Sequence, residues 1–341
     1  MAIVEIQHLS KHFKILNRHE GLLGAIRDLF SNDYRIVKAV DDISFTIEPG
    51  EIVGYIGPNG AGKSTTIKMM TGILKPDYGE ISVTGNVPFQ NRTKNAQNIG
   101  VVFGQRSQLW WDLPVIESFK LLKEIYRVDR HQFDRQMSRF NSLTDLKTLY
   151  PQTVRSLSLG QRMLCDMMAA FLHNPKIVFL DEPTIGLDVA IKARIRDLIK
   201  ELNRIHTTTI ILTTHDISDV EALCNRIIII DKGHIIYDGD IQRVNRLFGA
   251  YRTLKIQHQS VDEKPNTEMI TSDLVREFGE RNDISVKGGE GGWSTISFRQ
   301  DEIPLLKLLH YTLSHYQIRD VQIVELAMES VVKRIYEGAL Q

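Results

Sequence analysis

A glycine-rich stretch, GPNGAGKST at residues 57–65, constrains the fold of this chain more than any other feature. It follows a run typical of a strand, IVGYI, and leads into a run typical of a helix, TTIKMMTGIL. This is the context required by the pattern G-x-x-x-x-G-K-[ST], in which the glycines allow the backbone to approach phosphate oxygens closely. The helix N-terminus also favours negative charge. The stretch therefore predicts a phosphate-binding loop, and a chance glycine turn is a much weaker explanation.

The residue types in this loop suit a nucleotide triphosphate. Lys63 is expected to reach the β- and γ-phosphates, and the Ser64 hydroxyl is expected to ligate Mg²⁺. The candidate nucleotide-binding residues of the loop are Gly57, Pro58, Asn59, Gly60, Ala61, Gly62, Lys63, Ser64 and Thr65.

The order of apolar and helical segments predicts an α/β fold with a parallel sheet. From residue 175 onward, the short apolar runs IVFLDEP, TIILTTH and RIIIIDKG alternate with helical stretches. After about residue 245 the chain contains polar segments, a GGEGG turn, short strands, and helices expected at 302–315 and 328–338. We therefore expect a main domain at 1–245 and a small α+β domain at 250–341, which has a regulatory, dimer-stabilising or purely structural role.

Composition narrows the class of protein. The 341 residues are 42% hydrophobic and 25% charged with a formal net charge of zero, so no basic field points to nucleic acid. The apolar runs are strand-sized, far below the about 18 residues of a membrane span, and the N-terminal residues lack a secretory signal pattern. Cys165 and Cys224 form neither a metal motif nor a disulfide framework, which fits a reducing cytoplasm. His310 and His315 have poor spacing for a metal site.

A pair of carboxylates ends the apolar run in IVFLDEPTIGLD, residues 177–188. Asp181 at the end of a parallel strand would face the nucleotide crevice and hold Mg²⁺. Glu182 could polarise an attacking water as general base. An acidic pair alone would usually be an ordinary turn, but the phosphate loop favours the functional interpretation.

Two further segments complete the candidate site. LSLGQ at 157–161 precedes a long helical run, so Ser158 and the N–H groups near Gly160 are expected at a helix N-terminus that can bind an anion. His215 ends the run TIILTT and could contact a γ-phosphate or its attacking water, although such a histidine alone is more often structural.

The order GPNGAGKST, Gln105, LSLGQ, IVFLDEP, GLD and His215 resembles the nucleotide-binding subunit of an ABC transporter over roughly residues 1–245. The resemblance implies a P-loop ATPase core with a β-subdomain and a helical subdomain at about 107–170, and it implies ATP and Mg²⁺ as cofactors. It assigns catalytic roles to Glu182, His215 and Gln105. It assigns metal ligation to Ser64, Gln105 and Asp181. Further nucleotide contacts by resemblance are Ser158, Gly160, Gln161 and, in the D-loop, Asp188.

Two positions depart from the family pattern. In the family an aromatic residue stacks on adenine, and the position of Tyr34 relative to Lys63 suits that role. Phe13 matches the usual local motif but lies farther upstream, because residues 14–33 resemble an insertion that includes a helix expected at 20–31. In addition, Leu159 replaces the first glycine of the usual LSGGQ signature, and its backbone would be strained if the site required a positive φ there.

The resemblance also implies partners. ATP would lie between the phosphate loop of one subunit and the signature of another, so a homodimer is expected. Trp110 and Trp111 follow Gln105 closely, in the region that receives a transmembrane permease in this family, and Trp is enriched among interface anchors. One tryptophan of the pair could instead pack in the core of the helical subdomain. The helix expected at 20–31 could be a second partner contact or a satellite helix.

The direction of transport rests on a finer resemblance. GPNGAGKSTTIKMMTGIL with a C-terminal extension, and VVFGQRSQLWWDLPVIESF, are similar to bacterial exporter subunits for drugs, antibiotics or viologens. An importer ATPase with a C-terminal regulatory domain is the alternative. A soluble ABC ATPase is less favoured, because the chain has one GKST and one LSLGQ and lacks long coiled coils. The resemblance places the chain at the cytoplasmic face of the membrane, held through the permease.

Overall fold

The computed structural model describes residues 1–16, 34–104, 106–144, 146–214, 216–248, 251–259, 266–279 and 284–324. The chain divides into two compact units, Met1–Ile241 and Gln242–Gln341. Gln105 and His215 lie outside the described residues, as do the helices expected at 20–31 and 328–338. In the described part of the chain, no helix has both the length and the apolar character that a membrane crossing requires.

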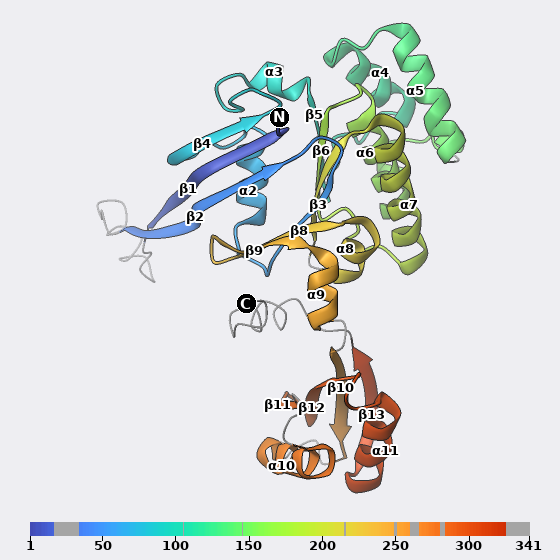
Figure 1. Ribbon diagram of the computed structural model, residues 1–341. Helices are drawn as coiled ribbons and strands as arrows, with labels where there is room; N and C mark the ends of the chain where they lie inside the picture. The colour runs from blue at the N-terminus through green and yellow to red at the C-terminus, as the bar shows by residue number, and fades with distance from the viewer. Residues whose placement is uncertain are drawn as a thin grey trace, which may run out of the picture. The chain divides into compact units, whose positions relative to one another are not determined.

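A six-stranded sheet forms the centre of the first unit (Figure 1). Its order is β5-β6-β7-β3-β8-β9, and all neighbouring pairs are parallel except β8 with β9. The α/β class expected from the sequence is confirmed, and the carboxyl ends of the parallel strands share one edge. The strands are β3 (Ile52–Ile56), β5 (Ile99–Phe103), β6 (Ile177–Asp181), β7 (Thr209–Thr214), β8 (Arg226–Asp231) and β9 (His234–Asp240).

A second, antiparallel sheet has the order β2-β1-β4, with β1 (Val4–Leu16), β2 (Tyr34–Ile47) and β4 (Tyr78–Val83). Residues 14–16, expected to begin an insertion, instead continue β1 and pair with β2. Helix α2 (Lys63–Met70) lies between the two sheets (Figure 1). Its buried Ile67, Met69 and Met70 join residues of both sheets in one hydrophobic core, which fixes the start of α2 beside β3.

The helices between Val115 and Leu223 cover the other face of the large sheet and extend into a helical region (Figure 1). Helix α6 buries an almost continuous run from Met163 to Phe171, as expected for a helix surrounded by protein. Helix α7 buries Ile195, Leu198, Ile199 and Leu202, the i, i+3, i+4, i+7 spacing of one helix face. The helices of the first unit, besides α2, are α3 (Arg92–Ala96), α4 (Val115–Ile125), α5 (Arg130–Leu143), η1 (Leu146–Thr148), η2 (Val154–Ser156), α6 (Leu159–Phe171), α7 (Val189–His206) and α8 (Ile217–Leu223). Helix α9 (Ile241–Phe248) begins at the last residue of the first unit and belongs to the second unit from Gln242 onward.

The second unit contains an antiparallel sheet of order β11-β12-β10-β13 with two helices. The chain order β-α-β-β-α-β with this strand order is the ferredoxin-like topology. Alternating residues of β10 and β12 form a core with both helices, through Leu254, Ile256, Ile296, Phe298 and, on the helices, Leu274 and Leu308. The elements are β10 (Tyr251–His258), α10 (Thr267–Phe278), β11 (Ser285–Gly288), β12 (Trp293–Arg299), α11 (Leu305–His315) and β13 (Ile318–Val324).

Candidate functional site

The glycine-rich loop after β3 is closely packed at its two ends. A Cβ added at Gly57 would lie 2.0 Å from the carbonyl oxygen of Ile230, and one added at Gly62 would lie 2.4 Å from that of Ala39. Gly62 also has φ of 112°, which side chains rarely adopt. Both positions therefore require glycine, and the loop leads directly into α2, whose first N–H groups form an anion site.

Lys63 is held within this loop. The residue is only 7% exposed, and its Nζ donates hydrogen bonds to the carbonyl oxygens of Gly57 (2.7 Å) and Pro58 (3.1 Å). The ammonium group of Lys63 is thus held beside the loop backbone, where its positive charge can attract phosphate oxygens.

Asp181 ends β6 and meets residues from two other elements. Its Oδ1 accepts hydrogen bonds from Thr213 Oγ1 at 2.5 Å, at the end of β7, and from Ser64 Oγ at 3.4 Å, in α2. A carboxylate and a hydroxyl are oxygen ligands of the kind that Mg²⁺ prefers. Two of the three residues expected to hold the metal are therefore neighbours, although 117 positions separate them in the chain.

Glu182 leaves the strand through an uncommon backbone conformation, with φ of 55°. Its N–H donates to the carbonyl oxygen of Thr213 at 3.0 Å and lies 3.2 Å from Thr213 Oγ1. A left-handed non-glycine residue costs on the order of 1–3 kcal/mol and persists where its surroundings hold it, commonly at functional sites. The turn gives Glu182 a backbone path different from that of Asp181.

Gly104 joins the end of β5 to this carboxylate pair. Its N–H donates to the Asp181 carbonyl oxygen at 2.7 Å, and a Cβ at this position would lie 2.2 Å from the Glu182 carbonyl oxygen. The residue that precedes Gln105 is thus fixed to the end of β6.

The LSLGQ segment begins α6, as expected. Ser158 is the N-cap: its Oγ accepts from the Gln161 N–H at 3.2 Å, and Gln161 Oε1 accepts from the Ser158 N–H at 2.9 Å. This reciprocal capping box stabilises the helix start. Gln161 thus engages the backbone of its own helix.

Leu159 occupies the first helical position of α6, has no positive φ, and is 37% exposed. The strain considered from the sequence is therefore absent. Gly160 has a separate packing role, because a Cβ there would lie 2.9 Å from the Ile191 side chain of α7. Asp188 caps α7, with its carboxylate accepting from the Ile191 N–H at 2.9 Å. The signature and the segment around Asp188 are therefore joined through Ile191.

A buried acid that the sequence analysis did not single out links the loops after β6 and β7. Asp219 in α8 is 0% exposed and accepts hydrogen bonds from Thr184 Oγ1 and, at 3.4 Å, from Thr214 Oγ1. Arg196 of α7 forms an ion pair with it and donates from Nε at 2.6 Å. Thr184 follows Glu182 closely, and Thr214 precedes His215. In the sequence, Asp219 stands in the pattern D-x-x-D after a strand, which is too common to identify this link.

A second acid, also missed, holds the segment that precedes the tryptophan pair. Asp166 of α6 is buried and accepts from Ser107 Oγ at 2.9 Å and from the Gln108 N–H at 3.0 Å. Trp110 and Trp111 are 39% and 54% exposed, so the alternative that one of them is a core residue is wrong. The Trp111 ring faces the Arg162 guanidinium at 5.2 Å.

The register of the β1–β2 hairpin separates the two candidate adenine-stacking residues. Phe13 pairs with Val37, close to Ala39, whose carbonyl approaches Gly62 of the loop. Tyr34 pairs with Leu16 and lies five positions before Ala39 along the strand, a span of about 16 Å. The strand register thus favours Phe13 over the Tyr34 expected from sequence.

The phosphate loop, the Ser64–Asp181 pair and the capped helix α6 together define a P-loop nucleotide-binding domain. The ABC transporter family model matches residues 40–185. The ABC transporter ATP-binding protein NatA of Bacillus subtilis is 33% identical over 62% of this chain and 86% of its own length. The chain therefore belongs to the family of ABC transporter ATP-binding proteins, and it is an ATPase.

Other relatives have different stated roles. The linearmycin resistance ATP-binding protein LnrL of Bacillus subtilis is 28% identical over 85% of this chain and 91% of its own length. A methionine import ATP-binding protein, MetN of Geobacillus kaustophilus, is 31% identical over 69% of this chain and 70% of its own length. Resistance and import relatives thus both resemble this chain.

Solved structures agree with the fold. The dimeric ATP-binding cassette MJ0796, bound to ADP and Pi after hydrolysis, has a TM-score of 0.57 and 25% identity, and the match covers 70% of this chain and 98% of the cassette. The cbiO1 subunit from Clostridium perfringens, part of the ABC transporter complex cbiONQ, has a TM-score of 0.58 and 25% identity over 72% of this chain and 91% of its own.

Proposed function

We propose that this chain is the ATP-hydrolysing subunit of an export transporter, in which two copies close on ATP and drive a separate membrane permease. The observation that carries the proposal is the convergence of Lys63, Ser64 and Asp181 beside Glu182, at the carboxyl edge of the sheet. Mg²⁺, held by Ser64, Asp181 and Gln105, would supply charge neutralisation at the β- and γ-phosphates.

The chain's own residues have distinct tasks in this proposal. Lys63 binds the β- and γ-phosphates, and Glu182 accepts a proton from the attacking water. His215 contacts the γ-phosphate or that water. The hydrogen bond from Gly104 N–H to the Asp181 carbonyl oxygen supports a role for Gln105 in sensing the metal and phosphate. Gly104 directly precedes Gln105 and is held to the end of β6 by this bond.

The dimer follows from the placement of the signature. The helix start at Ser158 and Gly160 offers N–H groups to the ATP of the opposite copy. The MJ0796 cassette is dimeric, which supports the same arrangement here. ATP would therefore hold two copies together, and hydrolysis would release them.

The test of catalysis is Glu182→Gln. This variant should bind ATP, lose about 10²- to 10⁴-fold in kcat, and accumulate as a dimer in analytical ultracentrifugation with ATP. Lys63→Ala should lose ATP binding, and Glu117→Gln, at an exposed carboxylate on α4, is the control. Turnover of Glu182→Gln at the parent rate would overturn the assigned role.

The adenine contact has its own test. Phe13→Ala should raise the Kd for ATP more than Tyr34→Ala, because stacking on adenine favours the aromatic residue nearer the phosphate loop. Fluorescence titration with ATP and with inorganic triphosphate alone separates the contact to adenine from the contact to the phosphates. A larger loss for Tyr34→Ala, confined to ATP, would restore the assignment made from the sequence.

The permease contact is proposed at Trp110 and Trp111. Both are exposed, and Asp166 fixes the segment that leads to them, which supports a rigid docking surface after Gln105. The double variant Trp110→Ala with Trp111→Ala should keep the ATPase rate of the isolated subunit but fail to co-purify with multi-helix membrane proteins. Ile73→Ala, at an exposed site outside this segment, is the control. Unchanged co-purification would refute the docking site.

The cytoplasmic face of the membrane is the proposed location, reached through the permease. Import is the second candidate function, because MetN relatives align over a similar length of the chain. Transport in inside-out vesicles that hold the subunit with its co-purified permease distinguishes the two. Accumulation of cargo inside such vesicles on adding ATP supports export, and its ATP-dependent loss supports import.

A further inference from the structure

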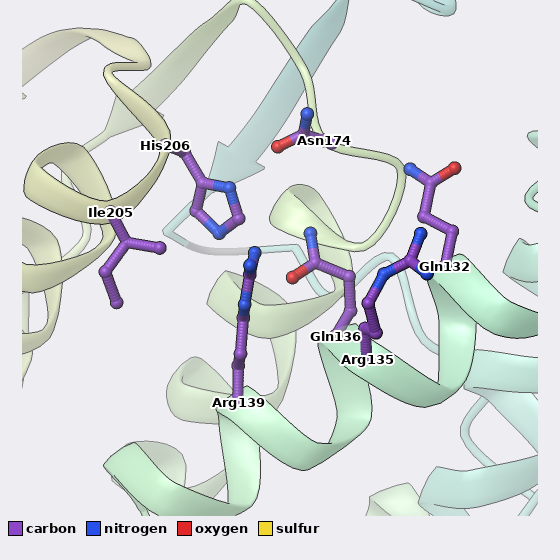
Figure 2. A pocket seen from close by; sticks show the side chains of 7 residues that line it. All are labelled: Gln132, Arg135, Gln136, Arg139, Asn174, Ile205 and His206. Atoms are coloured by element: carbon purple, nitrogen blue, oxygen red, sulfur yellow. The ribbon is translucent and has the colours of Figure 1, made fainter.

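A polar cavity of about 460 Å³ lies between helix α5 and the ends of α6 and α7, in a part of the molecule that the proposed mechanism does not use. Four of its residues lie at i, i+3, i+4 and i+7 on one face of α5, and three come from the opposite wall (Figure 2). This volume is within the range of small-molecule sites. The lining residues are Gln132, Arg135, Gln136, Arg139, Asn174, Ile205 and His206.

The α5 side of the cavity is cationic. Arg135 and Arg139 form no ion pair among the residues that the structure describes. Asp129 is engaged elsewhere: its carboxylate caps α5, and the hydrogen bond from Gln132 N–H, followed by weaker effects that include the charge of Arg135, lowers its pKa. Two guanidinium groups one helical turn apart suit an oxyanion, which they can bind through several N–H groups.

The inner end of the cavity carries polar atoms without partners. Gln136 is only 2% exposed; its Nε2 donates to the Phe171 carbonyl oxygen at 3.4 Å, and its Oε1 has no hydrogen-bond partner. His206 Nε2 is also buried and without a partner. Figure 2 shows Gln136, Arg139 and His206 pointing into the same space. Unsatisfied buried polar groups are unfavourable, so a ligand that forms hydrogen bonds with them gains affinity.

The protonation state of His206 suits an uncharged ligand group at the inner end of the cavity. Burial, and secondly the positive charge of Arg139, lowers the pKa of the His206 imidazole below its ordinary value. The ring is therefore neutral at neutral pH and can exchange hydrogen bonds with a hydroxyl. The carbonyl groups at the C-terminal end of α7 likewise favour hydrogen-bond donors over anions.

From this arrangement we infer that the cavity binds a phosphate ester of a small hydroxylated compound. The phosphate lies against Arg135 and Arg139, and a hydroxyl donates to Gln136 Oε1 near His206. Because the ligand contacts α5 on one side and the end of α7 on the other, its binding joins the helical region to the helix that follows Glu182. This site is independent of the proposed transport function.

Isothermal titration calorimetry of the full chain tests the inference. The Lys63→Ala background removes phosphate binding at the nucleotide loop, and the probes are ribose 5-phosphate, inorganic phosphate and ribose. Ribose 5-phosphate should bind at one site, and Arg135→Ala with Arg139→Ala should weaken it at least tenfold. Arg130→Ala with Arg155→Ala removes the same charge at exposed positions and should change the affinity less than twofold.

The hydroxyl contact needs a second variant. Gln136→Leu keeps the side-chain volume and removes Oε1, so it should weaken ribose 5-phosphate several-fold and leave inorganic phosphate unchanged. The inference is overturned if no phosphate probe binds, or if the Arg135–Arg139 variant binds as tightly as its control. Equal effects of Gln136→Leu on both phosphates would overturn the assignment of the hydroxyl.

Discussion

Asp181 and Glu182 are adjacent acids whose backbones give them different tasks. Asp181 completes a regular strand, and the hydroxyls of Thr213 and Ser64 fix its carboxylate. Glu182 follows with a left-handed backbone held by Thr213. One carboxylate is thereby fixed at the end of β6, and the other leaves the strand on a separate path. At the scale of the residue, function depends on backbone conformation as much as on residue type.

Asp166 shows a similar dependence on its surroundings. Burial raises its pKa to about 6, although hydrogen bonds from Ser107 and the Gln108 N–H act in the opposite direction. Because this native pKa exceeds the ordinary value of 3.8, the folded chain binds more protons than the unfolded chain between these values. The contribution of Asp166 to stability is therefore fully present below about pH 4 and is lost as the pH rises through 6.

Asp166→Asn tests this sign. The amide oxygen can still accept from Ser107 and Gln108, but the charge is gone. The free energy of unfolding of the variant relative to the parent should rise by on the order of 2 kcal/mol between pH 4.5 and 7. Urea unfolding at several pH values measures it, with the exposed Asp134→Asn as control. A difference that does not change with pH would contradict the burial of a charged Asp166.

At the scale of elements, α6 and α7 are joined where both begin. Gly160 faces Ile191, and Asp188 caps α7 through the Ile191 N–H. The LSLGQ segment and the segment around Asp188 therefore share one packing contact.

Gly160→Ala should disturb this contact. The new methyl would lie 2.9 Å from the Ile191 side chain, and overpacking of this kind costs about 1–3 kcal/mol. Ile191→Ala opens space, so the double variant should recover part of the stability lost by Gly160→Ala. Thermal unfolding of the four chains gives the coupling free energy. Additive effects would show that the two side chains do not interact.

The buried Asp219 makes a second connection between elements. Thr184→Val removes one hydroxyl that donates to Asp219 and keeps the side-chain shape. We expect kcat to fall several-fold with KM for ATP unchanged, because Thr184 and Thr214 position the loops that carry Glu182 and His215. Steady-state ATPase assays measure kcat and KM separately, and Thr184→Ser should restore kcat. A rise in KM alone would assign Thr184 to nucleotide binding instead.

The sequence predicted the segments of the candidate site and missed the residues that hold these segments in place. GPNGAGKST and IVFLDEP have fixed local patterns, so Lys63 and Asp181 could be identified without a structure. Asp219 and Asp166 act through partners distant in the chain, and no local pattern reveals such pairs. The capping roles of Gln161 and Asp188 needed the helix starts to be known at single-residue precision. The strand order of the large sheet, with its one antiparallel pair, could not be predicted because it depends on which strands pair.

At the scale of the whole molecule, the chain contains two units with separate cores. The first unit carries every described residue of the nucleotide site, and the second closes its own ferredoxin-like core. The division falls between Ile241 and Gln242, a few residues before the change of pattern in the sequence. Each unit buries enough apolar surface to form an independent core.

Differential scanning calorimetry should reveal this division. We expect two transitions, of which Mg²⁺-ATP with the Glu182→Gln chain raises only one. Ligand at 100 times its Kd stabilises the binding unit by about 2.7 kcal/mol. A chain ending at Phe248 should keep the ATP-sensitive transition and lose the other. A single transition that ATP shifts as a whole would show that the units unfold cooperatively.

The capping box at Ser158 has a consequence for the proposed dimer. Its Oγ already accepts the Gln161 N–H, so the hydroxyl hydrogen is the part left to meet an approaching oxyanion. A phosphate oxygen there would extend a hydrogen-bonded chain that begins in the helix backbone, and each link polarises the next. Binding of the opposite copy's nucleotide would thus depend on whether the first turn of α6 is formed. Unwinding a single turn would be enough to withdraw that donor.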